Sequence, residues 1–321
     1  PAAARRQFGD EPFELRNVLD YWVKSKDENL HYIPTDTVYI TLDKAAILRS
    51  GMYIPEQYRG ATDEETMSKM PDRMVISLKG RRMLTKNHIM LLEMLANTNW
   101  ERPLYMSTTV GSENYVGLEN FFLQEGLAYR ITPFNFRELG IAPQGGYAVD
   151  SETMYENLMN RFKFGGMSNP GIYIDETITR MGYTHRRLYT MLANQLIREG
   201  KKEKALAVLN KCDEEFPASI LPHNYWQSQS HLIGQAYLVL GETEKGMDIL
   251  GQVADNDIEY ITWYLSLDED RFATSFNEVR SCLGSLVKTI QIMEQSSDKE
   301  TLAHYSGLFD KLYQELELRV K

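Results

Sequence analysis

Residues 189–217 read YTMLANQLIREGKKEKALAVLNKCDEEFP, and this stretch decides the fold of the second half of the chain. Large apolar residues stand at Tyr189, Leu192 and Leu196. The small residue Ala193 stands where two helices must approach closely, and Gly200 is expected to end the first helix. The second helix has its own small contacts and a terminating proline, at Ala205, Cys212 and Pro217. The stretch therefore predicts a helical hairpin with a tightly packed inner face.

This spacing is typical of a tetratricopeptide (TPR) repeat, in which each hairpin leaves an apolar face for the next hairpin to cover. An ordinary amphipathic hairpin is the alternative for any single unit. Repeats of this kind bind or scaffold other molecules and seldom carry catalysis themselves. The stretch thus favours interaction over chemistry for this half of the chain.

A second copy of the pattern follows, with Ile233 and Gly234 in the places of Leu192 and Ala193. The offset between the copies is 41 residues, whereas a standard unit has ~34 residues. The connection after Pro217 is therefore expected to be longer than usual.

A third hairpin is predicted from helical periodicity alone, over residues 276–290 and 302–316. Ser297 and Glu300 have the spacing of a capping box at the start of its second helix. Because this hairpin lacks the small-residue signature, we interpret it as a terminal cap of the array.

Composition limits the class of protein and its partners. The 321 residues suit two domains, and the 43% hydrophobic and 25% charged content is ordinary for a globular chain. The net charge of −10 argues against nucleic acid or an anionic membrane surface as the main partner. The longest run without a charged residue, 216–241, is too rich in amides and histidines to span a membrane. No signal peptide is visible at the N-terminus.

No metal site and no cofactor are expected. Cys212 and Cys282 are the only two cysteines, and they lie in different predicted hairpins. Cys212 occupies a small-residue packing position, so we interpret it as a buried hydrophobe rather than a reactive thiol. The six histidines show no metal-ligand spacing, and the paired glycines at 145–146 and 165–166 do not continue as a phosphate-binding motif.

Strands and helices alternate in the first half of the chain. Strands are predicted over 31–42, 74–78, 104–110 and 128–132, and helices over 13–24, 43–48 and 85–97. This order indicates an α/β domain with a mixed sheet over residues 1–140. Residues 134–147, with three glycines and a proline, are the expected linker. The fold class is therefore α+β overall, with an all-α TPR-like domain over 148–321.

Three segments resemble a known family: PTDTVYITLDKAAILRSG, LTKNHIMLLEMLANTNWERPLYMSTTV and NYVGLENFFLQEGLAYRITP, followed by the TPR-like helices. The chain is similar to the soluble C-terminal portion of a bacterial family of multi-pass membrane proteins of unknown function, which itself resembles protein O-mannosyltransferases. The resemblance implies that a transmembrane region of the GT-C type precedes this portion and carries the catalytic acidic residues. It also implies a place on the extracytoplasmic (periplasmic) side of the inner membrane.

One candidate site lies in the α/β domain. Trp100 and Arg102 directly precede a predicted strand, and an indole beside a guanidinium suits a stacking platform for sugar or peptide. The alternative is that Trp100 plugs the end of the sheet while Arg102 pairs with a nearby glutamate. No set of nucleophile, base and orienting residue recurs in a known catalytic order, so no catalytic residue is predicted.

The second candidate site lies in the uncharged segment 223–229, HNYWQSQ. Aromatic rings beside amides suit carbohydrate or extended peptide. The segment is expected at the start of the second repeat's first helix, and first helices of such hairpins line the groove of the superhelix. We predict a binding groove lined by Tyr225, Trp226, Gln229 and His223. Helical geometry would place Trp226 ~100° from the face of Tyr225 and Gln229.

The preferred interpretation is a non-catalytic extracytoplasmic module of a GT-C-like, O-mannosyltransferase-like membrane glycosyltransferase, which binds or positions an acceptor protein. A free-standing TPR scaffold unrelated to glycosylation is the alternative, and a soluble enzyme centred on the α/β domain is a third. The partner is expected to be protein or peptide, with contact to a membrane only through the preceding region. Several apolar spans of ~20 residues encoded before Pro1 would favour the first interpretation. A true start codon at residue 1 would contradict it.

Overall fold

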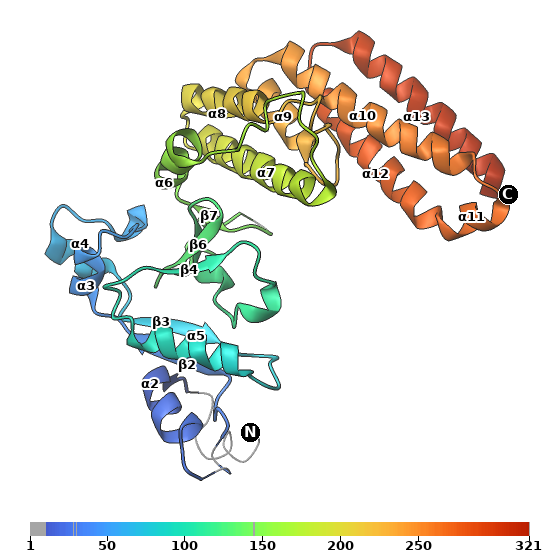
Figure 1. Ribbon diagram of the computed structural model, residues 1–321. Helices are drawn as coiled ribbons and strands as arrows, with labels where there is room; N and C mark the ends of the chain where they lie inside the picture. The colour runs from blue at the N-terminus through green and yellow to red at the C-terminus, as the bar shows by residue number, and fades with distance from the viewer. Residues whose placement is uncertain (1–10, 28, 30, 144, 321) are drawn as a thin grey trace. The chain divides into compact units, whose positions relative to one another are not determined.

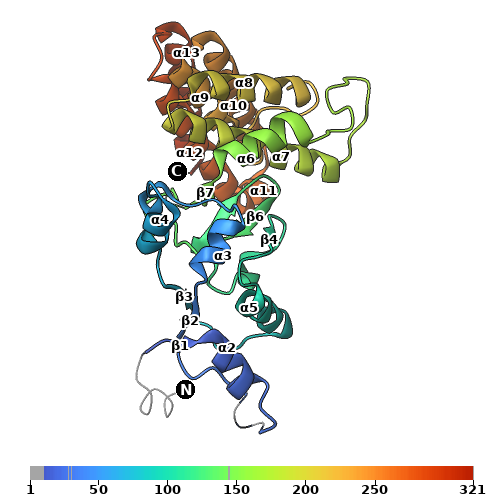
Figure 2. The same cartoon turned by 90° about the vertical axis from the view of Figure 1, so that its left-hand side faces the viewer.

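The computed structural model describes residues 11–27, 29, 31–143 and 145–320. The chain divides into two compact units, Pro1–Met154 and Tyr155–Lys321 (Figures 1 and 2). The first unit carries two mixed sheets and the second is helical, which confirms the α+β fold class. The first ten residues of the expected α/β domain lie outside the described residues. Each described helix is too short or too polar to cross a bilayer.

The first sheet of unit 1 has the strand order β1-β2-β3. Its strands are β1 Phe13–Glu14, β2 Thr37–Thr41 and β3 Arg73–Ser77. β1 runs parallel to β2, and β2 runs antiparallel to β3. Val38 and Ile76 face each other in the β2–β3 register and are both fully buried, so one face of this sheet packs on the core.

The second sheet has the order β4-β6-β5-β7. Its strands are β4 Leu104–Ser107, β5 Phe122–Gln124, β6 Ala128–Ile131 and β7 Ala148–Val149. β5 runs parallel to β7, and the other pairs are antiparallel. The mixed strand directions predicted from the sequence are confirmed, but the strands are divided between two sheets. The short strands β5 and β7 give no alternating pattern, yet they supply partners that complete a separate sheet.

Helices of unit 1 flank these sheets (Figure 2). They are α2 Leu15–Val18, continued by a π-helical turn Leu19–Val23, then α3 Lys44–Arg49, α4 Asp63–Lys69 and α5 Lys86–Asn97. Short 3₁₀ turns lie at Glu56–Tyr58, Ser112–Asn114 and Glu119–Phe121. The helix α4 falls in a segment where no regular element was expected. Thr62 explains it, because its side chain accepts a hydrogen bond from the Glu65 N–H and caps the helix.

The segment expected as a linker begins inside the core of unit 1. Phe134 and Phe136 are fully buried. Their rings lie 5.5 Å from Tyr58 and 6.2 Å from Tyr53, respectively. The glycine and proline content of 134–147 marked turns correctly, but these two phenylalanines fix the segment to the unit that precedes it.

Unit 2 is a stack of helices. A helix at the boundary, α6 Ser151–Glu156, continues as a π-helical turn Asn157–Arg161. The stack itself comprises α7 Glu176–Arg198, α8 Lys202–Glu215, α9 Ser230–Leu240, α10 Thr243–Leu265, α11 Glu269–Thr274, α12 Phe276–Met293 and α13 Lys299–Val320. α7 pairs with α8 and α9 pairs with α10, while α10 also packs against α12 and α13 (Figure 1). The third predicted hairpin is α12–α13.

The expected close contacts of the first two hairpins are confirmed. Ala193 and Ala205 are fully buried between α7 and α8. In the second hairpin, a Cβ built on Gly234 would lie 2.6 Å from Leu250 Cγ and 3.0 Å from the Gly246 carbonyl oxygen. The glycine is therefore required by the close approach of α9 to α10.

One expected helix cap is wrong. The capping box predicted at Ser297 and Glu300 is replaced by Asp298, whose carboxylate accepts from the Thr301 N–H at 3.0 Å and the Thr301 hydroxyl at 2.7 Å. A carboxylate one residue nearer to the helix is the stronger acceptor for the free N–H groups of the first turn.

Candidate functional site

The segment predicted to bind a ligand forms a loop before α9. The helix begins at Ser230, and Gln229 adopts a left-handed backbone with φ +52°. The Asn224 side chain accepts hydrogen bonds from the N–H groups of Gln227 (2.7 Å) and Ser228 (3.0 Å). The helical start expected at 223–229 is therefore wrong, because this local turn satisfies the backbone donors that a helix would need.

Two arginines of α7 hold the loop in place. Arg186 is 1% exposed, and its guanidinium donates to the carbonyl oxygens of Phe216 (2.6 Å) and Leu221 (2.7 Å). Arg187 donates to the Gln227 carbonyl oxygen at 2.7 Å. A buried guanidinium is tolerated only when its donors find acceptors. The connection between the first two hairpins is thus tied to the helix stack at both of its ends.

The loop borders a cavity of about 480 Å³, which we call the aromatic cavity. Loop residues meet side chains of α10 and α12 there, with Tyr183 of α7 at the edge. The lining residues are Tyr183, Pro222, Asn224, Trp226, Gln227, Asn256, Asp257, Tyr260, Tyr264, Asn277, Glu278, Ser281 and Cys282. Trp226 is 57% exposed and Tyr260 is 49% exposed. Large rings so open to solvent beside side-chain amides are typical of a binding surface rather than a core.

A carboxylate lies at the inner wall of the aromatic cavity. Asp257 is 2% exposed, and Ser285 of α12 donates to its Oδ2 at 2.7 Å. Among the described residues, Oδ1 has no hydrogen-bond partner. Burial raises the pKa of Asp257 to about 7, while the Ser285 hydrogen bond opposes this shift. The second carboxylate of the lining belongs to Glu278, which is exposed at the rim.

Of the four residues predicted for the groove, Trp226 lines the aromatic cavity and the other three have different roles. The Tyr225 ring stacks on His231, with centroids 3.9 Å apart. His223 is buried and bonds through Nδ1 to the Ser230 hydroxyl at 2.7 Å, and burial lowers its pKa to about 3. Gln229 is exposed and stands at the start of α9.

The platform proposed in the first unit is not formed. Trp100 is 3% exposed and belongs to the core, where it also borders a small cavity of about 240 Å³. Asn99 and Trp100 both have positive φ, and the indole of Trp100 is buried at this left-handed turn. Arg102 is exposed. The alternative interpretation, in which Trp100 closes the sheet, fits this position.

The contributions of α10 and α12 to the aromatic cavity were not predicted from the sequence. Asn256, Tyr260 and Tyr264 are spaced by four residues and lie on one face of α10. Asn277 and Ser281 repeat this spacing on α12. These spacings are a readable signal, but sequence alone does not show that the two faces meet at one loop.

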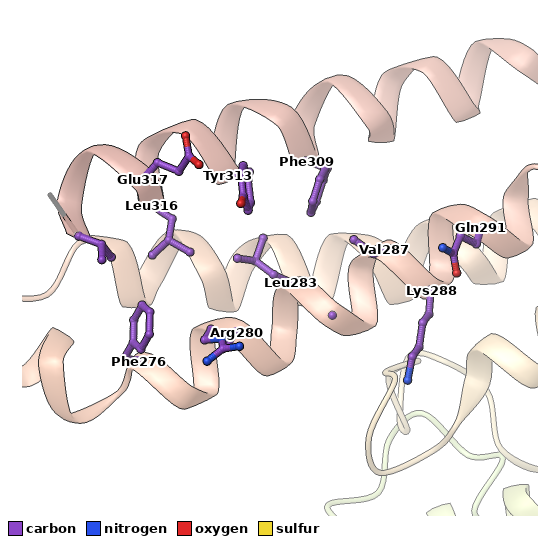
Figure 3. Close-up of a pocket in the computed structure, with 12 residues that line it drawn as sticks. Phe276, Arg280, Leu283, Val287, Lys288, Gln291, Phe309, Tyr313, Leu316 and Glu317 are labelled. Atoms are coloured by element: carbon purple, nitrogen blue, oxygen red, sulfur yellow. The ribbon is translucent and has the colours of Figure 1, made fainter.

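A second hollow, which we call the apolar groove, lies between α12 and α13 and has a volume of about 750 Å³ (Figure 3). Leu283 and Val287 of α12 face Phe309, Tyr313 and Leu316 of α13 across it. A terminal cap presents a polar outer face, so the apolar lining is not what the cap interpretation of this hairpin implies. Its lining also includes Arg280, Lys288, Gln291 and Glu317, so the groove combines an apolar floor with charged and amide groups.

Comparison with known proteins assigns part of the chain. Residues 4–152 match the family model of TMEM260-associated domain 2. This family is linked to a membrane protein, so unit 1 is similar to a domain of a membrane protein. No curated protein and no solved structure matches the chain. The matched region ends before α7, and the aromatic cavity therefore lies outside it.

Proposed function

We propose that the chain is the non-catalytic, extracytoplasmic portion of a membrane glycosyltransferase that resembles protein O-mannosyltransferases. Its helical unit binds an acceptor polypeptide in the aromatic cavity. The match of residues 4–152 to TMEM260-associated domain 2 supports a membrane parent, and the TPR-like packing supports a binding role for the helical unit.

The observation that carries the binding role is the position of Trp226. Its ring is 57% exposed at a cavity that also presents Asn224 and Gln227 from the same loop. Two arginines hold this loop, so the ring needs little ordering when a ligand arrives. An extended polypeptide presents apolar surface and amide groups together, which an aromatic ring beside side-chain amides can match.

The experiment is site-specific photo-crosslinking in cells. A photoreactive phenylalanine analogue replaces Trp226 in the full-length protein, and a second strain carries it at Trp263, which is 54% exposed and outside the cavity lining. The expected result is an adduct at position 226 with extracytoplasmic polypeptides that carry O-linked hexose. The same adducts at both positions, or adducts with cytoplasmic proteins only, would contradict the proposal.

A further inference from the structure

The charges of the aromatic cavity restrict what it can hold. The carboxylates of Asp257 and Glu278 belong to its lining, whereas none of its lining residues is lysine or arginine. The nearby cations Arg186 and Arg187 are already bonded to loop carbonyls. The lining itself carries negative charge and no positive charge, so phosphate, nucleotide-sugar and acidic peptide ligands are disfavoured relative to cationic ones.

The buried carboxylate of Asp257 has one acceptor oxygen without a hydrogen-bond partner among the described residues. The Asp257 side chain is only 2% exposed, yet of its two oxygens only Oδ2 accepts a hydrogen bond, from the Ser285 hydroxyl. Burial raises the pKa of Asp257 to about 7, and the Ser285 hydrogen bond only partly opposes this shift. A positively charged group beside Oδ1 would compensate the carboxylate charge. A cationic ligand would therefore give the buried carboxylate the counter-charge that it lacks.

Aromatic rings supply the second half of a cation site. Trp226, Tyr260 and Tyr264 line the same cavity as the two carboxylates. Indole and phenol faces attract organic cations through the ring quadrupole, and indole is the strongest of them. Neutral sugars also stack on such rings and donate hydroxyl hydrogen bonds to carboxylates, but they bring no positive charge to offset the burial of Asp257. The combination favours a cation over a neutral polyol.

Resting on the proposed binding of an acceptor polypeptide, we propose that the aromatic cavity binds an arginine side chain of that polypeptide. The guanidinium lies against Trp226 and donates to the carboxylates of Asp257 and Glu278. Arginine fits better than lysine because its planar guanidinium stacks on an indole. Its N–H donors still point outward in the guanidinium plane, toward oxygen acceptors. The cavity volume of about 480 Å³ also leaves room for the residues that flank the arginine.

Calorimetric titration of the 321-residue chain tests this inference. The probes are the acetylated, amidated peptides Gly-Ser-Arg-Ser-Gly, its citrulline and lysine analogues, and methyl α-mannoside. Citrulline has nearly the shape of arginine without the charge. The expected result is binding of the arginine peptide, at least about tenfold weaker binding of the citrulline peptide, and intermediate binding of the lysine peptide.

Two matched variants separate a site effect from a general charge effect. Glu278→Gln is expected to weaken the arginine peptide about tenfold. Glu259→Gln removes an exposed carboxylate of α10 outside the cavity lining and is expected to leave the affinity unchanged. Both residues are exposed, so both variants are expected to fold, and their melting temperatures verify this.

Several outcomes overturn the inference. These are equal affinity for the arginine and citrulline peptides, equal loss in the two glutamine variants, preferential binding of the mannoside, and no arginine binding up to about 1 mM peptide. If one of them occurs while the crosslinks at position 226 persist, the inference fails and the proposed function stands. If the crosslinks are absent, the proposed function fails, whatever the titration shows.

Discussion

Ser285 of α12 donates a 2.7 Å hydrogen bond to the carboxylate of Asp257 on α10, so the inner wall of the aromatic cavity is also a link between two helices. The acceptor is charged or neutral depending on pH, because burial raises the pKa of Asp257 from 3.8 to about 7. Under the proposed function, stability and ligand binding therefore depend on the same residue.

Asp257→Asn is expected to stabilise the protein at pH 8 relative to wild type. A carboxyl group with a raised folded-state pKa binds more protons in the folded than in the unfolded state between about pH 4 and 7, so stability falls as pH rises through this window. Asparagine removes this loss, which we place on the order of 1–4 kcal/mol. Thermal melts from about pH 4 to 8 measure it, with Asp310→Asn on the exposed side of α13 as the control. A constant difference between variant and wild type across this range would refute the prediction.

Gly234→Ala is expected to destabilise the protein by about 1–3 kcal/mol, because its Cβ would lie 2.6 Å from Leu250 Cγ. Gly284→Ala on α12 is the matched control, since its Cβ meets nothing within 4 Å. That variant is expected to be neutral or more stable by up to about 1 kcal/mol, as alanine favours helix. Chemical denaturation distinguishes the two. Equal stability would mean that α9 and α10 tolerate a wider spacing.

His231→Phe is expected to protect the protein against acid. Burial, with a smaller effect from the Lys288 charge, lowers the pKa of His231 to about 4. The unfolded state then binds the proton first, and stability is lost as pH falls from about 6.5 to 4. Phenylalanine keeps a ring against Tyr225, where the His231 stack is 3.9 Å, and removes the titration.

The expected gain from His231→Phe is about 1–3 kcal/mol near pH 4.5 and small near pH 8. His304→Phe, at an exposed position of α13, serves as the control. Unfolding curves at both pH values give the comparison, and a gain of equal size at both would point to packing instead of protonation.

Trp226→Ala is expected to leave the melting temperature within about 2 °C of wild type and to weaken the arginine peptide at least about tenfold. The ring is 57% exposed, so its loss removes little packing. Tyr173→Ala changes an aromatic residue that is 90% exposed and outside the cavity lining, and it is expected to affect neither quantity. Unfolding of the Trp226 variant would assign that ring to the core.

The isolated chain is expected to transfer no sugar from lipid-linked or nucleotide-linked donors. The sequence holds no nucleophile, base and orienting residue in a known catalytic order, and the proposed function places catalysis outside this chain. Radiolabelled-donor assays with the purified chain provide the measurement, and any turnover above a heat-denatured control would show that this portion is itself an enzyme.

Much of the helical unit was predictable because its pattern is local. The spacing of Ala193, Gly200 and Gly234 indicates where helices approach or end, and the structure places all three as expected. The start of α9 was not predictable from periodicity, since the Asn224 side chain stabilises a competing turn. Trp226 was predicted because the uncharged segment around it combines aromatic rings with amides. Asp257 was missed because its significance depends on burial against α12, which no spacing on α10 encodes.

The sheets show the same limit. The strands β2 and β3 have clear alternation and were found, whereas β5 and β7 have two or three residues each and are defined by their partners. Trp100 was offered as a platform on its residue type, but the positive φ at Asn99 and Trp100 could not be read from the sequence.

In the connection between α8 and α9, the backbone position and the exposed side chains depend on different residues. Arg186 anchors it through backbone carbonyl oxygens, which every residue type possesses. Side chains such as Trp226 can therefore be exchanged while the anchor and the helix stack remain intact. Under the proposed function, exposed side chains of this connection set the ligand preference while Arg186 holds the backbone, so the two properties are separable by mutation.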